Sequence, residues 1–473
     1  MSLFIEYIRE FGRFQRNARL YLLSNALSGV TTGILLVLYN LYLASLGYRT
    51  DFIGLVLFIG TLGAGLAIFP AGYCIDRYGG KLILIWSNLA VGIAGAGQIL
   101  FRQPLPLLAT AFVVGVATAF QLVVNAPYLA QNSTERERPH LFSFNIVVSL
   151  GTTVLGEVLG GALPLWFRAL PVLMAPLPAS IHWLLATQAL PRSYQLALLS
   201  AGLLAGPSLV PLFLLSNDRP SHASSLVPTS ITATSLAPTS DITTCRENPC
   251  ESQAPGFTPR LVTWAQQGRL ALTKWWKTTR TMNIRSVLMS AFFVLTLVQG
   301  LVGLGAGLFI PYFNLYFVEH LHASSALFGL IDGAANGINA LLTLLAPWLA
   351  QRIGKIPTVA LTRLLSIPLL LIIGLTSFLP LAALLYLFRQ GAMDMANGIF
   401  QVYSMEAVPE QRRGLANSTY QAVFQGAETV TTPLGGIMIA HLGYIPVFVA
   451  GAVCYAISTG ILWARFARGG IGK

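Results

Sequence analysis

The chain has 473 residues, of which 55% are hydrophobic and only 10% are charged, and its mean hydropathy is +0.67. This composition excludes an ordinary soluble domain and predicts a protein of the lipid bilayer. The formal net charge of +12 does not predict a nucleic-acid partner, because the basic residues gather on one side of the predicted membrane topology.

Long apolar runs recur along the whole chain. A hydrocarbon core about 30 Å thick needs roughly 20 apolar residues in each spanning helix. None of the runs alternates with period two, so helices are favoured over barrel strands. The sequence therefore predicts an all-α polytopic membrane protein with twelve transmembrane helices. The predicted spans are residues 20–46, 53–75, 82–100, 105–130, 142–166, 194–216, 286–317, 324–349, 356–378, 380–405, 415–440 and 444–466.

Basic residues are spread unevenly over the predicted loops. With a cytoplasmic N-terminus, four arginines face outward and two lie inside spans, which leaves 23 of the 29 lysines and arginines on the cytoplasmic side. The six exceptions are Arg49, Arg102, Arg168, Arg192, Arg363 and Arg389. This bias predicts a multi-pass protein of the cell membrane with both termini in the cytoplasm. Residues 4–19 are expected to form an amphipathic entry to the first span, not a cleaved signal.

The composition changes after the sixth span. Residues 217–260 are rich in Ser, Thr and Pro and are predicted to be a disordered tether. Residues 261–285 mix tryptophans with basic residues and are expected to lie on the inner membrane surface, with a calmodulin-type or lipid-specific site as the alternative. Cys245 and Cys250 in the tether are expected to be free thiols in a reducing cytosol, with a disulfide or metal clip as the alternative.

The first six spans and the last six repeat one another. Asn40-Leu41-Tyr42 recurs as Asn314-Leu315-Tyr316, 274 residues later, and after one inserted residue the offset becomes 275. Further matched positions are Gly33 with Gly307, Gly54 with Gly329, Arg77 with Arg352, Gly79 with Gly354, Glu135 with Glu410, Arg138 with Arg413, Ser143 with Ser418, and Gly160-Gly161 with Gly435-Gly436. The repeat predicts two six-helix bundles, residues 1–216 and 286–473, joined by a cytoplasmic linker at 217–285.

Charges and glycines cluster in the stretch GYCIDRYGGK, residues 72–81, at the predicted cytoplasmic turn between spans two and three. Gly79 and Gly80 would permit a tight reversal, and Gly72 would allow close helix approach. Asp76 stands at the end of its helix, where it can meet a helix N-terminus or an arginine of the other bundle. The basic residues Arg77 and Lys81 can extend to the lipid headgroups.

This stretch resembles the loop 2–3 signature of the major facilitator superfamily of secondary transporters, and AQRIGK at residues 350–355 is similar to its weaker second copy. The resemblance covers nearly all of the chain except about 217–285 and 167–192. It implies two bundles that work by alternating access and a gating role for the motif. The implied gating residues are Gly72, Asp76, Arg77, Gly79, Gly80, Lys81, Gln351, Arg352 and Gly354. Because Gln351 replaces the acidic residue, the gating role rests on Asp76, and a turn that only fixes topology is the alternative.

A second stretch, GEVLGG at residues 156–161, resembles part of a motif in the drug and metabolite antiporters of this superfamily. Glu157 stands where that motif has proline. The resemblance implies export, whereas the alternative is that small residues simply pack the fifth helix against a neighbour.

Five ionisable residues fall inside predicted spans, and their repeat partners are all uncharged. They are Glu157, Asp332, Arg389, Asp394 and Glu428. A charge at mid-helix costs about 2.5–3.5 kcal/mol on insertion scales, so each needs a partner, a proton or a wet cavity. Arg389 and Asp394 project about 140° apart on one helix, so Arg389 is expected to pair with Asp332, Glu428 or an anionic substrate. By resemblance, Arg389 and Asp394 lie near the substrate path; a structural ion pair is the alternative.

Asn40 and Asn314 are further candidates for substrate contact, although helix packing or membrane anchoring explains them equally well. The sequence predicts a secondary active transporter of a small organic solute, coupled to protons, with export favoured. It is expected to be a monomer in the lipid bilayer, to have no cofactor or metal and to be no enzyme. The alternatives are proton-coupled uptake of a sugar or metabolite, a lipid scramblase and a non-transporting sensor.

Overall fold

The computed structural model describes residues 14–134, 137–176, 178, 182, 184–216, 290–408 and 413–466. The chain divides into two units, one made of Met1–Pro220 with Ala291–Lys473 and the other of Ser221–Ser290. The predicted tether, the predicted surface segment, Cys245, Cys250 and residues 4–13 lie outside the described residues. Cys74 and Cys454, in the first unit, carry free thiols.

All regular secondary structure in the described residues is helical, and no strand occurs among them, as predicted. Each predicted span coincides with a helix, except that the seventh span is divided. A 19-residue α-helix is followed by a 3₁₀ turn, a short α-helical turn and a π-helical turn, and the 3₁₀ turn contains Pro311, which cannot donate a backbone hydrogen bond. In the first half the helices are α2 (Arg16–Ser45), α3 (Thr50–Tyr78), α4 (Gly80–Leu100), α5 (Pro104–Gln131), α6 (Arg138–Arg168), α7 (Pro171–Met174) and α8 (Ala189–Phe213). In the second half they are α11 (Ala291–Phe309), η2 (Ile310–Tyr312), α12 (Phe313–Leu315), η3 (Tyr316–His320), α13 (Ser325–Ile353), α14 (Lys355–Leu375), α15 (Leu379–Glu406), α16 (Arg413–Leu442) and α17 (Tyr444–Phe466).

Ten spans in the described residues are both long enough and apolar enough to cross a membrane. The other two long helices, α15 with 28 residues and α16 with 30, are long enough but more polar. They carry Arg389, Asp394 and Glu428, together with several asparagines and glutamines. Polar helices that are this long belong against protein or water and not against lipid, which makes this pair a candidate wall of a site.

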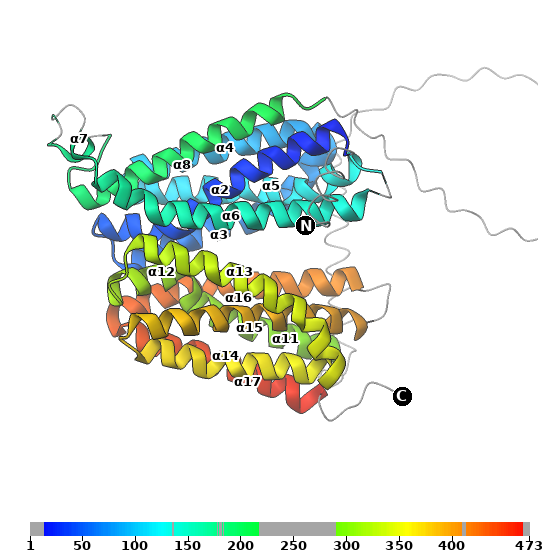
Figure 1. The fold of residues 1–473 in the computed structure, drawn as a ribbon. Coiled ribbons are helices and arrows are strands. Elements are labelled where there is room, and N and C mark those ends of the chain that lie inside the picture. The colour runs from blue at the N-terminus through cyan, green and yellow to red at the C-terminus, as the bar shows by residue number, and fades with distance from the viewer. Residues whose placement is uncertain are drawn as a thin grey trace, which may run out of the picture. The chain divides into compact units, whose positions relative to one another are not determined.

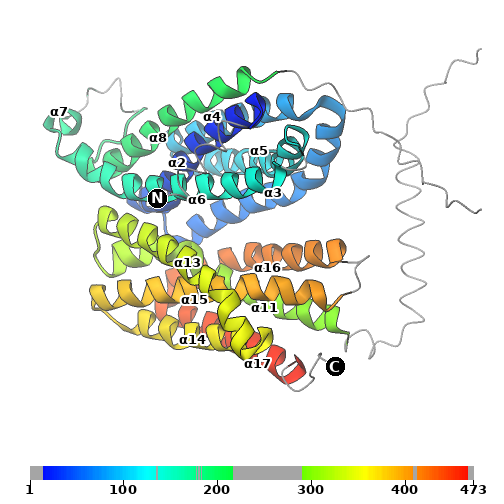
Figure 2. The same cartoon turned by 45° about the vertical axis from the view of Figure 1, so that its right-hand side comes forward.

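The helices form two bundles that pack in the same pattern (Figures 1 and 2). In the bundle drawn from blue to green, α2 packs against α6 and α8, and α3 packs against α5. In the bundle drawn from yellow-green to red, α11 packs against α16 and α17, and α13 packs against α15. These are the pairs that the repeat relates, so the predicted two-bundle fold is confirmed.

Individual contacts repeat as well. The hydroxyl of Tyr42 donates to the carbonyl of Ile99 at 2.7 Å, and the hydroxyl of Tyr316 donates to the carbonyl of Ile373, 274 residues later at both ends. Both of these bonds tie the first helix of a bundle to its third. The repeat in the sequence is therefore a repeat of buried hydrogen bonds, not only of glycines.

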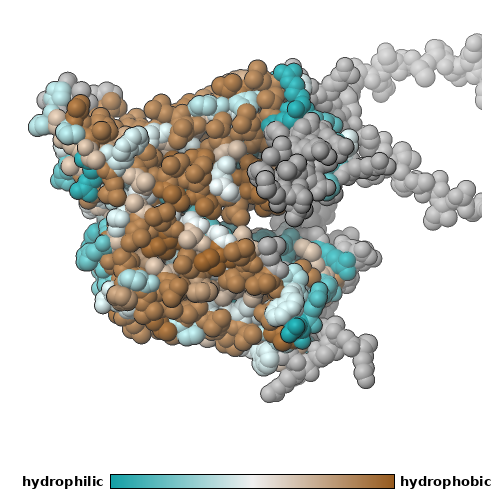
Figure 3. All heavy atoms as spheres, in the orientation of Figure 1, coloured by the Kyte–Doolittle hydropathy of each residue, from teal (hydrophilic) through white to brown (hydrophobic). Residues whose placement is uncertain are grey.

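Apolar side chains cover the visible sides of both bundles, and hydrophilic residues gather toward the helix ends (Figure 3). Phe69, Leu122 and Ile93 are 86%, 69% and 66% exposed. Large exposed apolar groups in such number suit a lipid environment, and the backbone groups beneath them are bonded within helices. The surface agrees with a protein that spans a bilayer.

Candidate functional site

Two ends of the molecule need to be distinguished. We call the end where α8 finishes at Phe213 and α11 begins at Ala291 the linker end, and the opposite end the far end. Because the helices alternate in direction, α2 begins and α17 finishes at the linker end too. The loops after α2 and α6 and the turn before α13 lie at the far end.

At the far end the two bundles touch along two seams, α6 against α13 and α3 against α16. Ser325 Oγ donates to the carbonyl of Gly161 at 3.0 Å in the first seam, and Thr50 Oγ1 donates to the carbonyl of Gly436 at 2.9 Å in the second. The two bonds are related by the 275-residue offset. Arg49 Nη2 adds a bond to the Ala440 carbonyl at 3.1 Å. Each bundle therefore makes the same hydrogen bond to the other.

Glycines allow these seams to close. A Cβ added at Gly161 would lie 2.5 Å from the carbonyl oxygen of Ser325 and 3.0 Å from the Cα of Ala326, and one added at Gly436 would overlap the Thr50 carbonyl. No side chain fits at either place, since backbone meets backbone across the seam. The sequence showed that Gly160-Gly161 recurs as Gly435-Gly436. It did not show that these glycines lie between the two bundles.

Toward the linker end the same four helices part. Among the described residues, an added Cβ would have nothing within 4 Å at Gly151 of α6, Gly337 of α13, Gly65 of α3 or Gly426 of α16. Gly72 also faces open space, so the expectation that it permits close helix approach is wrong for this conformation. Among the described glycines of the two seams, contact between bundles is confined to the far end.

Asn40 and Asn314 take part in the far-end seal. Asn40 Nδ2 donates to the carbonyl of Pro311 at 2.7 Å, and Asn314 Nδ2 donates to the carbonyl of Val37 at 3.3 Å. Pro311 lies 274 residues after Val37, so the two bonds are exchanged by the repeat. In this conformation both side-chain amides donate to backbone carbonyls of the opposite bundle. A role for them in substrate binding stays a prediction.

Of the two seams, as far as the structure describes them, the α6–α13 seam contains a buried acid and the α3–α16 seam contains none. Glu157 of α6 is 1% exposed, and Asn336 Nδ2 of α13 lies 3.0 Å from each of its carboxylate oxygens. Four residues before Asn336, Asp332 accepts a hydrogen bond of 2.9 Å from the hydroxyl of Tyr386. In the α3–α16 seam the repeat puts the uncharged Thr432 where Glu157 stands. The asymmetry predicted from the sequence is therefore a difference between two otherwise equivalent seams.

Asp394 of α15 is held by amides. Asn339 Nδ2 donates to Asp394 Oδ2 at 2.7 Å, and Gln390 Nε2 donates to the same oxygen at 3.2 Å. Glu428 differs, because its backbone packs against Gly307 of α11 while its carboxylate has no hydrogen-bond partner among the described residues. Asp394 thus belongs to a polar network that starts on α13, and Glu428 lies apart from it.

Arg389 pairs with no acid among the described residues. Its guanidinium is fully buried and donates to Gln390 Oε1 at 3.1 Å and to the Tyr455 hydroxyl at 3.2 Å. It lies 4.9 Å from the ring centre of Phe309 and 5.8 Å from that of Phe313. In the described part of the chain it forms no ion pair, so the expected pairing with Asp332 or Glu428 is wrong. Aromatic rings, whose faces attract cations, surround it instead.

A second buried arginine has a role that the sequence did not reveal. Arg363 of α14 is fully buried, donates through Nη2 to Gln299 Oε1 at 3.2 Å, and lies 5.1 Å from the ring centre of Phe400. Within the part of the chain that the structure describes, its Nε and Nη1 have no hydrogen-bond partner. The sequence did show a single arginine in an otherwise apolar span. It gave no information about which residues would surround that arginine.

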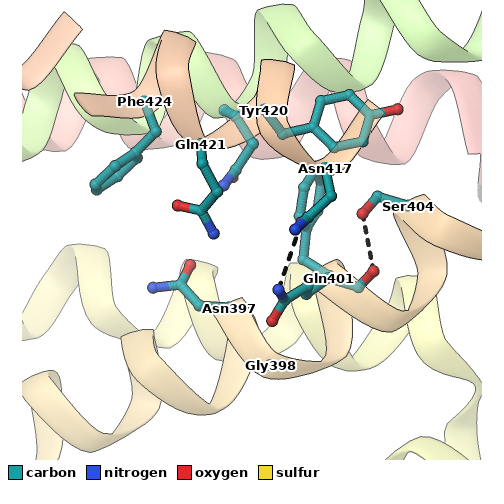
Figure 4. A pocket seen from close by; sticks show the side chains of 10 residues that line it. Asn397, Gly398, Gln401, Ser404, Asn417, Tyr420, Gln421 and Phe424 are labelled. Atoms are coloured by element: carbon teal, nitrogen blue, oxygen red, sulfur yellow. Dashed lines mark hydrogen bonds between the residues drawn. The ribbon is translucent and has the colours of Figure 1, made fainter. Parts of the chain in front are cut away.

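Gln299 and Phe400 also line a cavity of about 160 Å³ between α11, α15 and α16, toward the linker end. Its lining residues are Gln299, Asn397, Gly398, Phe400, Gln401, Ser404, Asn417, Tyr420, Gln421 and Phe424. Figure 4 shows Asn397 and Gln401 rising from one helix toward Asn417 and Gln421 of the other. Asn397 and Gln401 are four residues apart, as are Asn417 and Gln421, so each pair lies on one face of its helix. This spacing was visible in the sequence, but a search for charged residues overlooked it.

Beside it, a more apolar cavity of about 460 Å³ lies between α13, the start of α14 and α15. Gln351 of the second motif copy lines it, and so does Lys355, which forms an ion pair with Glu406. Gly398 lines both cavities, so α15 presents one face to each.

The remaining motif residues shape the linker-end turns. Gly79 and Gly354 have φ values of 83° and 90°, and each ends one helix and starts the next without a loop. A side chain would be strained there, as the glycine-turn prediction requires. Gly80 is the first residue of α4, and Asp76 lies in the last turn of α3. Its gating role stays a prediction.

The basic residues of the motif contact protein. Lys81 Nζ donates to the Leu215 carbonyl at 2.6 Å beyond the end of α8, and its reach to the headgroups stays a prediction. Arg77 is exposed and donates to the Tyr73 hydroxyl at 3.2 Å. Arg352 stacks 4.5 Å above the ring of Trp348. Lys81 therefore joins the motif to the last helix of its own bundle.

The GEVLGG stretch has two faces. Gly156 and Gly160 approach Val30 and Ile34 of α2 in the same bundle, while Gly161 and Glu157 face α13 of the other. Packing of the fifth helix against a neighbour, the alternative reading of this stretch, describes the first face. The second face lies in the seal.

The two repeated six-helix bundles meet at one end and part at the other, beside a polar cavity. This arrangement is typical of secondary membrane transporters. A family model described as Major Facilitator Superfamily matches residues 21–294 and 295–469. The chain belongs to this superfamily, and the resemblance inferred from the sequence is confirmed.

Solved structures agree in fold. A bacterial homologue of the human lysosomal transporter Spinster, inward-facing and occupied, has a TM-score of 0.68 at 12% identity, over 96% of each chain. The nucleoside transporter NupG has a TM-score of 0.63 at 14% identity, over 96% of this chain and 98% of that one. The inward-open xylose transporter XylE from E. coli has a TM-score of 0.60 at 16% identity, over 94% and 95%.

Proposed function

We propose that this transporter moves a small organic solute by alternating access and couples that movement to protons. The observation that carries the proposal is Glu157, a buried acid without a cation, in a seam that must separate when the far end opens. Its hydrogen-bond partner Asn336 belongs to the other bundle. A carboxyl group out of water needs a cation, hydrogen-bond donors or a proton.

Opening the far end would move α6 away from α13, remove Asn336 from Glu157 and admit water. The affinity of Glu157 for a proton would then differ between the two conformations. A group whose proton affinity changes with conformation, and whose solvent access changes sides, is what coupling requires. Asp332, one turn from Asn336, and Asp394, held by amides on α15, are the next candidates.

Export is the direction we propose, on the resemblance of GEVLGG to the antiporter motif. Proton-coupled uptake of a sugar or other metabolite is the second candidate, favoured by the amide-lined cavity. Among the structural neighbours, one is described as a D-xylose–proton symporter. We further propose that residues 1–216 and 286–473 are the two moving parts of a monomer in the cell membrane. Both termini and the linker end would face the cytoplasm, so this conformation would be open inward.

Transport in proteoliposomes with an imposed pH gradient tests the proposal. Glu157→Gln is expected to keep solute exchange across a gradient-free membrane and to lose acceleration by the pH gradient, because the amide can bond Asn336 but cannot carry the proton. Thr432→Val, at the equivalent place in the other seam, is the matched control and should keep both activities. A Glu157→Gln protein that responds to pH as the parent does would exclude Glu157 as the coupling site.

The same preparation tests the direction. Proteoliposomes with an acid lumen should accumulate the solute if protons and solute move in opposite directions, as export driven by the inward proton gradient requires. Accumulation only with an acid medium would show that both move together and would establish uptake. Binding of a solute without any gradient-driven accumulation would contradict transport and indicate a sensor.

A further inference from the structure

We propose that the cavity between α11, α15 and α16 binds an uncharged, polyhydroxylated solute of monosaccharide size, and that Arg363 fixes the hydrogen-bonding pattern of this cavity from behind. The inference deepens the proposed transport function and depends on it for its physiological meaning. Binding itself is a separate property, which can be measured without any transport.

The first argument is the absence of charge in the lining. The ten lining residues contribute five carboxamides, two hydroxyls and three aromatic rings, and none is ionisable at neutral pH. A charged solute in this cavity would leave water without meeting a counter-ion. Arg363 does not supply one, because it is not part of the lining. Gln299 and Phe400, which are, stand between it and the cavity.

The second argument is the direction in which each amide points. A guanidinium can only donate hydrogen bonds, so the contact from Arg363 fixes Gln299 with its carbonyl oxygen backward and leaves its NH₂ group to donate elsewhere. Gln401 Nε2 donates to Asn417 Oδ1 at 3.4 Å, as Figure 4 shows. That bond leaves the Asn417 NH₂ group as a donor and the Gln401 carbonyl as an acceptor.

One more polar atom of the cavity lining lacks a partner. Asn397 Oδ1 is buried and forms no hydrogen bond within the described residues. A buried polar group without a partner is costly, so a ligand that bonds to it gains affinity. The cavity therefore alternates donors with acceptors, and hydroxyl groups, which both donate and accept, match this pattern. The rings of Phe400 and Phe424 suit the C–H faces of a sugar or polyol.

The third argument is size. The cavity volume of about 160 Å³ is far above the roughly 10–15 Å³ that a single water molecule needs on the same measure. Drug-sized ligands occupy cavities of about 300–1,000 Å³. A solute the size of a pentose, a hexose or a short polyol fits, whereas a nucleoside would have to extend beyond the lining.

Titration calorimetry on the full-length protein in lipid nanodiscs tests the proposal. The probes are D-glucose, D-ribose and xylitol as neutral solutes, D-glucuronate as the anion and D-glucosamine as the cation. At least one neutral probe should bind, and both charged probes should bind at least tenfold more weakly. Tighter binding of the anion, or no binding of any neutral probe, would overturn the proposal.

Variants locate the site. Asn397→Ala and Gln421→Ala should each weaken binding of the neutral probe by about tenfold, the effect of one lost hydrogen bond and an exposed partner. Val402→Ala is the control, because Val402 lies next to Gln401 on α15 but lines the other cavity. Equal affinity in Asn397→Ala, Gln421→Ala and Val402→Ala would place the ligand elsewhere and overturn the proposal.

A double-mutant cycle tests the role of Arg363 as a positioning residue. Arg363→Met and Gln299→Leu should each weaken binding, and the double variant should be no weaker than Gln299→Leu alone, if Arg363 positions the cavity through that amide. The double variant removes the buried charge together with its hydrogen-bond partner, and the thermal unfolding midpoint of each variant reports whether it is folded. Additive losses would show that Arg363 acts independently and overturn its assigned role.

The outcomes also separate this inference from the transport proposal. A neutral polyol that binds but is never driven by a pH gradient would contradict coupled transport and leave the site standing. Gradient-driven transport of another solute class, with no polyol binding, would contradict the site and leave transport standing.

Discussion

The far-end seal makes a sharp prediction about conformational balance. In Gly161→Ala the added Cβ would lie 2.5 Å from the Ser325 carbonyl oxygen and 3.0 Å from the Ala326 Cα, both backbone atoms of the opposite bundle. Ordinary contacts lie about 3.5–4.0 Å apart, so α6 and α13 must separate by about 1 Å. Overpacking of this kind costs about 1–3 kcal/mol. Only the sealed conformation bears this cost.

The ratio of sealed to open molecules should therefore fall by about 5-fold to about 150-fold. Gly151→Ala is the control, because it lies on the same helix, changes the same group and meets nothing within 4 Å. Both variants share the gain in helix propensity of about 0.8–1.0 kcal/mol, so it cancels between them.

Electron-spin distance measurements between labels at the far end read out this ratio. Ala169 and Ser377 are exposed and lie in far-end loops of opposite bundles, so cysteines can be placed there after the four native cysteines are replaced. Gly161→Ala should add or enlarge a long-distance population, and Gly151→Ala should not. Identical distance distributions in the two variants would refute the view that close packing of glycine holds the seal.

Three further predictions follow from other parts of the chain. Deleting residues 221–255 should leave transport rates within about twofold, because their composition cannot form a packed core; loss of transport in correctly inserted protein would assign that segment a specific role. Asp76→Asn should slow turnover more than it weakens substrate binding, measured as the initial rate against equilibrium binding, because Asp76 lies at the linker-end turn. Arg389→Lys should lower the thermal unfolding midpoint, because a lysine cannot reproduce the geometry of both hydrogen bonds to Gln390 and Tyr455. Each hydrogen bond from a charged group contributes about 1.5–3 kcal/mol. An unchanged midpoint would contradict a stabilising role for these bonds.

The position of each spanning helix could be predicted from the sequence. Membrane insertion depends on the composition and length of a segment, and both are local properties. The seventh span is the exception, divided around Pro311 into pieces that no hydropathy pattern could delimit. The repeat was visible because glycine and tyrosine at matched positions serve one contact in each bundle, such as Tyr42 with Ile99 and Tyr316 with Ile373.

The pairing of the intramembrane charges could not be predicted in the same way. Charge alone suggested that Arg389 meets an acid, but three rings from α11, α12 and α17 converge on it, and such convergence depends on how helices distant in sequence pack. The amides of the cavity were overlooked because a neutral polar residue carries little signal until its neighbours are known.

The sequence by itself determined the membrane environment, the helices, the two-bundle repeat and the positions of the buried acids, because each follows from local composition or from internal comparison. Tertiary structure alone decided that Gly161 and Gly436 seal the bundles against each other, that Glu157 lies in one of two equivalent seams, and that Arg363 stands behind Gln299. These contacts join residues more than 60 positions apart, and their energies depend on distances that no local pattern encodes.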